Sequence, residues 1–194
     1  TPYETLSRVR FNKPGKHNLL NALAAMAMAT TLGTPLGHIA KALETFKGIK
    51  RRFTYHINER DLVYIDDYAH HPTEIEAVHQ AVRSAHPDKK VTVVFQPHLY
   101  SRTKDFAQEF AKSLADFDEI ILLDIYPARE QPIEGVDSDW LLNLINHSCK
   151  HKVAKEQLCE VLNKSTSKVY LTLGAGDIGQ EVNSIKKVLS EKVY

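Results

Sequence analysis

The chain has 194 residues, of which 43% are hydrophobic and 25% are charged, as in a folded globular protein rather than a disordered one. Its formal net charge of +1 lacks the basic excess that is typical of nucleic-acid or membrane-surface binders. Cys149 and Cys159 lack the spacing of a metal site, no apolar run is long enough to span a membrane, and the first residues show no signal-peptide pattern. We therefore expect a soluble, cytoplasmic protein with reduced thiols.

The first 50 residues predict a short strand followed by two helices. The strand is expected over Ser7–Phe11, although no partner strand is near it in the sequence, and the helices over Asn18–Leu32 and Pro35–Phe46. After Gly48 comes the basic pair Arg51-Arg52, and from Phe53 onward the pattern changes. We place a domain boundary there, between residues 1–50 and residues 51–194.

The second part of the chain alternates short apolar strands with helices. The expected strands are Phe53–Ile57, Leu62–Ile65, Val91–Phe95, Ile120–Leu123 and Val169–Leu173. The expected helices are Thr73–Ala85, Lys104–Leu114, Ser138–Asn146, Lys155–Asn163 and Ile178–Lys192. Apolar runs without in-out alternation are typical of strands covered on both faces. The first two strands read as a hairpin, so we predict an α/β fold whose mostly parallel, mixed sheet is flanked by helices.

Polar residues gather directly after three of these strands. They are Asp66, Asp67, Tyr68, His70 and His71 after the second strand, Gln96, His98, Tyr100, Ser101 and Arg102 after the third, and Asp124, Tyr126, Arg129 and Glu130 after the fourth. The carboxyl ends of parallel strands share one edge of the sheet, where ligands bind. A mixture of Arg, His and carboxylate there suits an anionic or zwitterionic ligand. The alternative is that the Asp pair caps the turn and the histidines are solvated.

The two histidines do not favour a zinc site, because His70 and His71 are adjacent and point in different directions from an extended turn. The segment Gly174–Gly179 matches the dinucleotide fingerprint G-x-G-x-x-G, but no second strand or ribose-binding acidic residue follows it. It is either a helix N-terminus that approaches a phosphate or simply a tight turn.

Asn18 and Asn21 lie three residues apart at the start of a predicted helix, which places their carboxamides on one face. A carboxamide offers a donor and an acceptor side by side, as the edge of adenine requires. Asn18 alone also fits an ordinary helix N-cap.

Taken together and in order, these segments resemble the Mur ligases. The matching segments are Gly15–Asn18, Asn21–Ala25, Arg51–Phe53, Asp66–Glu74, Phe95–His98, Ser101–Thr103, Tyr126–Glu130 and Gly174–Asp177. The resemblance implies that residues 51–194 are a Rossmann-like C-terminal domain and that residues 1–50 are the helical tail of the central ATP-binding domain. The Walker loop G-x-x-x-x-G-K-[ST] is not in this sequence, so we expect a fragment that is inactive alone.

The resemblance also implies a reaction. The resemblance is most specific for members that use ATP with Mg²⁺ to join L-alanine to UDP-N-acetylmuramate. That reaction proceeds through an acyl-phosphate and is a step in peptidoglycan precursor synthesis. The expected partners are these small molecules and the protein's own central and N-terminal domains, not nucleic acid or membrane. The metal ligands are expected outside this chain.

Roles follow residue by residue from the same resemblance. Its implied catalytic residues are Arg52, Asp67 and His70. Its implied substrate-binding residues are Tyr68, His98 and Arg102, and its implied ATP-binding residues are His17, Asn18, Asn21, Arg52 and Asp67. The first three of these ATP-binding residues would recognise adenine. Leu99 departs from the family pattern, since many members have Arg there, so Arg102 would hold the alanine carboxylate alone.

Three other functions remain open at this point. The first is a relative that attaches a peptide during murein recycling, which shares the Asp-Asp-aromatic-Ala-His-His pattern. The second is an NAD-dependent oxidoreductase built on Gly174–Gly179. The third is a non-catalytic nucleotide-binding module.

Overall fold

The structure, a computed structural model, describes residues 5–192 except for the side chain of His17. The chain forms two compact units that divide between Ile49 and Lys50, and each is described here by itself. The first unit contains α1 (Lys16–Thr31) and α2 (Leu36–Thr45). The predicted strand over Ser7–Phe11 is wrong, since the described segment has no strand partner and runs as irregular backbone.

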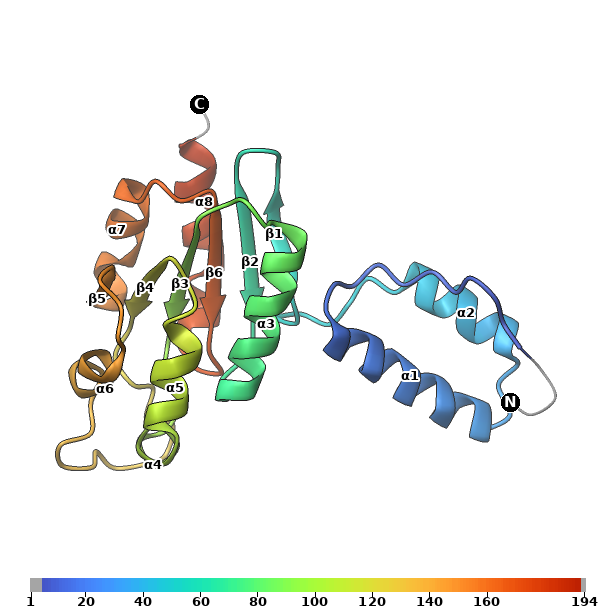
Figure 1. The fold of residues 1–194 in the computed structure, drawn as a ribbon, viewed down its shortest axis with the longest axis horizontal. Coiled ribbons are helices and arrows are strands. Elements are labelled where there is room, and N and C mark those ends of the chain that lie inside the picture. Colours follow the sequence, from blue (N-terminus) through green and yellow to red (C-terminus); the bar gives the residue numbers. More distant parts are fainter. Residues whose placement is uncertain (1–4, 193–194) are drawn as a thin grey trace. The chain divides into compact units, whose positions relative to one another are not determined.

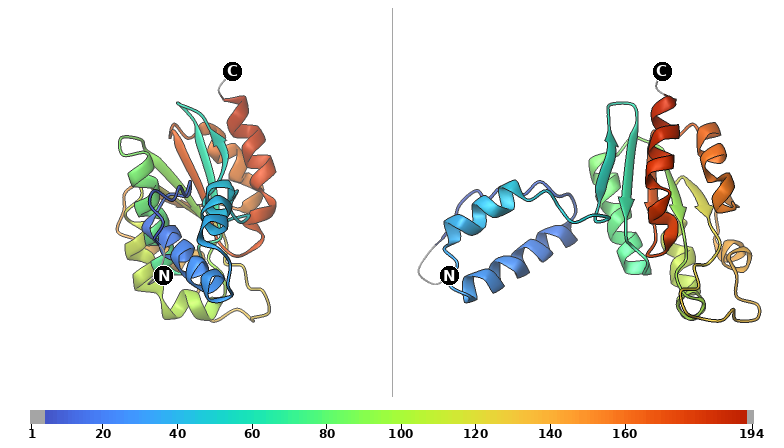
Figure 2. Two further views of the ribbon diagram at one scale, coloured as in Figure 1. Left: turned by 90° about the vertical axis from the view of Figure 1, so that its right-hand side faces the viewer. Right: turned by 180° about the vertical axis from the view of Figure 1, so that it is seen from behind.

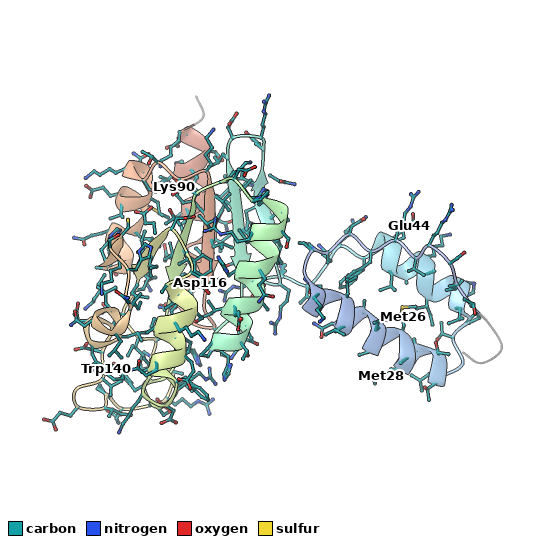
Figure 3. The ribbon with its side chains drawn as sticks, viewed as in Figure 1. Met26, Met28, Glu44, Lys90, Asp116 and Trp140 are labelled. Atoms are coloured by element: carbon teal, nitrogen blue, oxygen red, sulfur yellow. The ribbon has the colours of Figure 1, made fainter. Side chains whose placement is uncertain are left out.

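Helix α1 leaves much of its apolar surface uncovered within its unit. Its exposed large apolar residues are Leu19, Leu20, Leu23 and Met28, followed by Leu32 at the C-cap. Met26, in contrast, is partly covered (Figure 3). A helix that is apolar on most sides is typical of the interior of a larger domain.

The second unit is built on one mixed sheet of six strands (Figure 1). The strands are β1 (Thr54–Asn58), β2 (Val63–Asp67), β3 (Val91–Phe95), β4 (Glu119–Leu122), β5 (Lys150–Lys152) and β6 (Val169–Leu173). Their order is β1-β2-β6-β3-β4-β5, with β1 antiparallel to β2 and every other pair parallel. The predicted α/β fold class and the first hairpin are therefore confirmed.

Helices cover both faces of this sheet, as Figures 1 and 2 show from opposite sides. One face packs against α3 (Pro72–Ala85), α5 (Ala107–Leu114) and α6 (Ser138–Leu144), and its core includes Phe95 and Phe110. The other face packs against α7 (Leu158–Lys164) and α8 (Val182–Glu191), around Tyr64 and Ile185. The strands β2, β3 and β6 are buried along their whole length, which explains their unbroken apolar sequences.

Three predicted helices differ in detail from those of the structure, and one strand was not predicted. The single helix expected over Lys104–Leu114 is two helices, α4 (Tyr100–Asp105) and α5, separated at Phe106 where the backbone leaves helical geometry. The last two helices each begin with a 3₁₀ turn, η1 (Lys155–Gln157) and η2 (Asp177–Gln180). Strand β5 was not expected, because its Lys-His-Lys sequence lies at the sheet edge and carries no apolar pattern.

No helix in the described range 5–192 is long and apolar enough to cross a membrane.

Candidate functional site

The loops that follow β2, β3, β4 and β6 all leave the same edge of the sheet, because these strands are parallel. Strand β6 lies between β2 and β3, so the strand order reverses here, which is the position at which α/β sheets bind ligands. Backbone contacts join two of the loops. Leu99 N–H donates to the Tyr126 carbonyl at 3.0 Å, and Tyr126 N–H donates to the Pro97 carbonyl at 2.8 Å.

A row of aromatic rings runs along this edge. Tyr68 meets His70 edge to face at 5.2 Å between ring centroids, and His70 meets His98 at 6.0 Å. The His98 ring then stacks on Tyr126 at 5.7 Å. Arg102, four residues after His98, places Nη1 3.5 Å from His98 Nδ1. Four predicted substrate or catalytic residues, Tyr68, His70, His98 and Arg102, are thus brought together.

The pKa of His98, in the middle of this row, is shifted by its surroundings. Burial, followed by the neighbouring Arg102 and His70, lowers the pKa of His98 below its ordinary value, so the ring stays neutral near neutral pH. Arg102 is therefore the fixed positive charge beside a neutral imidazole. The guanidinium of Arg102 beside the neutral His98 ring is suited to bind a carboxylate.

Arg52 lies at the beginning of the same row. Its guanidinium carbon is 5.8 Å from the centre of the Tyr68 ring, and Nη1 is 3.9 Å from Glu74 Oε1. Half of the Arg52 side chain is exposed, so the guanidinium remains accessible to an anion such as phosphate.

Asp67, an implied catalytic and ATP-binding residue, is buried in the described structure. Its side chain is only 3% exposed, and its two oxygens accept backbone N–H groups from Phe53 and Ala69, each at 2.7 Å. Burial raises the pKa of this carboxyl group, although the two hydrogen bonds oppose the shift. In the described structure Asp67 holds the turn after β2, and its implied roles in catalysis and ATP binding stay predictions.

The glycine-rich segment surrounds a protein side chain. Arg51 donates from Nε to Asp66 Oδ2 at 2.9 Å and from Nη2 to the Gly174 carbonyl at 2.7 Å. A Cβ built on Gly179 would lie 2.7 Å from Arg51 Cζ. We call this enclosure, formed by Asp66, Gly174 and Gly179, the Arg51 socket.

The rest of the glycine-rich turn packs just as closely. Gly174 has φ +144°, and a Cβ there would lie 2.7 Å from the Gln96 carbonyl oxygen. Gln96 also accepts from Ile178 N–H at 2.9 Å and donates to Asp177 at 2.7 Å. Close packing and a satisfied amide account for the glycines, so the geometry gives no support to a dinucleotide phosphate or to the NAD alternative.

Two further residues hold the helix starts next to the site, and neither of them had a role predicted from the sequence. His71 is the N-cap of α3: its Nδ1 accepts from Thr73 Oγ1 at 2.9 Å and from Thr73 N–H at 3.4 Å. Glu130 accepts from Ser101 N–H at 3.0 Å and from Ser101 Oγ at 2.5 Å, at the start of the helix that carries Arg102. Glu130 stood among the polar residues after β4, but its partner 29 residues earlier could not be identified from sequence.

The predicted adenine-binding residues all lie in the first unit. Asn18 donates from Nδ2 to the Pro14 carbonyl at 2.6 Å, whereas Gly15 is the N-cap of α1. Asn21 is exposed on the same helix. His17 lies in α1 too, but its side chain is outside what the structure describes. Their predicted role in binding adenine is not tested.

Residues 5–192 contain no group of three or more His, Cys, Asp or Glu side chains that is arranged to hold a metal ion. This donor set does not fit a resident Mg²⁺, so no chemical step is assigned to a metal held by this part of the chain.

Comparison with known proteins gives consistent matches. The family model described as "Mur ligase, glutamate ligase domain" matches residues 51–180. UDP-N-acetylmuramate–L-alanine ligase from Flavobacterium psychrophilum is 62% identical over 192 residues, which is 99% of this chain and 43% of the relative. The same-named ligase from Flavobacterium johnsoniae is 58% identical over 193 residues, 100% of this chain and 43% of the relative.

Among solved structures, UDP-N-acetylmuramate–alanine ligase from Thermotoga maritima matches with a TM-score of 0.78 and 29% identity, over 96% of this chain and 40% of that one. A murein peptide ligase from Psychrobacter arcticus has a TM-score of 0.66 at 20% identity, over 93% of this chain and 38% of that one, and shares the fold. The chain thus spans about two fifths of the length of the curated relatives that it matches.

Proposed function

Because the chain belongs to the Mur ligase family, we propose that it is the C-terminal part of an ATP-dependent ligase that joins L-alanine to UDP-N-acetylmuramate. The similarity to two L-alanine ligases over nearly the whole chain supports this substrate pair. The observation that carries the proposal is the contact of Arg102 with His98 beside His70, because it forms a compact site for a small zwitterion.

In this proposal the muramoyl carboxylate first attacks the γ-phosphate of ATP and forms an acyl-phosphate. The amine of L-alanine then attacks the acyl carbon, and phosphate leaves. Arg102 pairs with the alanine carboxylate, and Tyr126 and Tyr68 form the walls of the site through their contacts with His98 and His70. Rate enhancement comes mainly from positioning the two reactants and from excluding water.

Arg52 is proposed to contact ATP phosphate, since it is a half-exposed guanidinium beside Tyr68. Asn18, Asn21 and His17 are proposed to contact adenine from the first unit. Asp67 is proposed to act mainly by holding the turn that carries Tyr68 and His70. Mg²⁺ is proposed to be held by a part of the enzyme outside residues 5–192.

The exposed apolar residues of α1 support the proposal that this unit packs against the remainder of a larger ATP-binding domain. We place the enzyme in the cytoplasm, where its nucleotide substrates are found.

The proposal is tested with the full-length enzyme, ATP, UDP-N-acetylmuramate and isotopically labelled L-alanine. We expect labelled UDP-N-acetylmuramoyl-L-alanine and one equivalent of ADP. Product formed with a tripeptide in place of alanine would instead identify a peptide-recycling ligase. Absence of both products would refute the ligase proposal.

A further inference from the structure

The ring of His70 is held in one tautomer. Its Nδ1 lies 2.9 Å from the Tyr68 carbonyl oxygen and 3.3 Å from Glu74 Oε2. A carbonyl oxygen and a carboxylate accept hydrogen bonds, so Nδ1 carries a proton, and in the neutral ring Nε2 then carries the lone pair. The hydrogen bonds of the His70 ring within residues 5–192 use Nδ1. His71 is the reverse case, because its Nδ1 accepts from Thr73.

Glu74 fixes His70 from two directions. Its Oε2 accepts the backbone N–H of His70 at 2.9 Å and lies beside the ring nitrogen of the same residue. Glu74 is itself fixed in the first turn of α3, after the His71 cap, and its other oxygen faces Arg52 at 3.9 Å. A histidine oriented by a carboxylate through Nδ1, with Nε2 open, is the arrangement of a general base.

His98 has the opposite arrangement on the other side of the site. A guanidinium only donates, so the 3.5 Å contact with Arg102 makes His98 Nδ1 an acceptor and leaves the proton on Nε2. An amino acid presents donors at its ammonium and acceptors at its carboxylate. The His70 side therefore suits the ammonium, and the His98–Arg102 side suits the carboxylate.

We propose that His70 Nε2 is the base that removes a proton from the ammonium of the incoming amino acid, and that Glu74 is the positioning residue that makes this nitrogen available. The proposal rests on the ligase function proposed above. The charged and titratable groups around His70 are Glu74 from α3, Tyr68 on its own segment, His98 and Arg102 from the region after β3, and Arg52.

The step balances in atoms and charge. The ammonium gives one proton to His70 Nε2, and the freed lone pair forms the C–N bond at the acyl carbon. The bond from that carbon to the phosphate oxygen breaks, and phosphate leaves with the bonding electrons. The attacking nitrogen passes its second proton to the departing phosphate, which leaves an amide and hydrogen phosphate. The imidazolium is stabilised by Glu74 until its proton passes to water.

The test compares two amines in the full-length enzyme with ATP and UDP-N-acetylmuramate. L-Alanine enters as an ammonium ion, so a base must remove a proton before it can attack. Hydroxylamine is already unprotonated at neutral pH, so it converts an acyl-phosphate to a hydroxamate without help from a base. For His70→Gln we expect kcat with L-alanine to fall by about 10²–10⁴-fold. Hydroxamate formation should stay within about threefold of the unmodified enzyme, because it does not use the base.

Glu74→Gln tests the positioning role, and Glu76→Gln, an exposed carboxylate on the same helix, is the matched control. Glu74→Gln should lower kcat with L-alanine by about tenfold with little change in its KM, and should spare the hydroxamate reaction. Glu76→Gln should leave both reactions unchanged. The circular dichroism spectrum of each full-length variant checks that it folds like the unmodified enzyme.

Equal loss of the alanine and hydroxylamine reactions in His70→Gln would overturn the proposal, and so would full alanine activity in that variant. A higher alanine KM at unchanged kcat in Glu74→Gln would show a binding role instead. If His70→Gln does not fold, the kcat and KM of Glu74→Gln decide. Absence of hydroxamate with the unmodified enzyme would refute the acyl-phosphate ligase itself, which is a distinct outcome.

Discussion

The buried ion pair of the Arg51 socket should make a large contribution to the stability of the second unit. Asp66 is fully buried, and its two oxygens accept from Arg51 Nε at 2.9 Å and Thr172 Oγ1 at 2.7 Å. Asp66→Asn keeps the shape of the side chain but removes the charge, so the guanidinium of Arg51 loses its partner. Removal of one member of a buried pair costs about 3–5 kcal/mol. Because 21% of the Arg51 side chain is exposed and can be hydrated, we expect about 3 kcal/mol.

Urea unfolding of the 194-residue chain measures this loss, with Trp140 fluorescence as the probe. Trp140 packs against the core of the second unit from α6, where Figure 3 labels it, so its signal reports that unit. With a urea m-value of about 2 kcal/mol/M, a loss of about 3 kcal/mol lowers the midpoint by about 1.5 M. Asp61→Asn is the control, since that carboxylate is 68% exposed and pairs with Lys168 at the surface, and it should shift the midpoint little. Equal midpoints for the two variants would refute the reasoning.

The Arg51 socket, Arg102 and His98 each give one further prediction. Gly179→Ala should lower the stability of the second unit by about 1–3 kcal/mol, because its Cβ would lie 2.7 Å from Arg51 Cζ; an unchanged urea midpoint would contradict this packing. Arg102→Ala in the full-length enzyme should raise the KM for L-alanine by about 10- to 100-fold, the loss expected for one charged hydrogen-bonding partner, and an unchanged KM would remove Arg102 from the amino-acid site. Because burial and Arg102 lower the pKa of His98 below 6.5, the unfolded chain binds more protons than the folded chain just below that pH. Stability should therefore fall as the pH drops through 6.5, and His98→Gln should flatten part of this slope in urea midpoints measured from about pH 7.5 to about 5.5; identical slopes would contradict the assignment.

Much of the fold followed from local sequence pattern. The predicted bounds of β3 and β6 are those of the structure, because strands covered on both faces carry unbroken apolar runs. Pattern failed where the surroundings decide the structure. The segment of β5 forms a strand because it pairs with β4, although its own sequence has no strand pattern. The Ser7–Phe11 segment has the composition of a strand but no partner in the described structure.

The candidate site was predictable to a similar extent. Placing His70, His98 and Arg102 at one edge needed only the rule that parallel strands end together. The Arg51 socket was not predictable, because the contact with Gly174 spans 123 residues of sequence. The buried state of Asp67 and the tautomer of His70 depend on which backbone groups face them, and sequence spacing does not give this.

The central claim is that His70, His98 and Arg102 together form the site of the incoming amino acid. A crystal structure of the full-length enzyme with L-alanine, UDP-N-acetylmuramate and a non-hydrolysable ATP analogue tests it most directly. We expect the alanine carboxylate on Arg102 and the alanine nitrogen facing His70 Nε2. Alanine bound at a different edge of the sheet, away from all three side chains, would contradict the account.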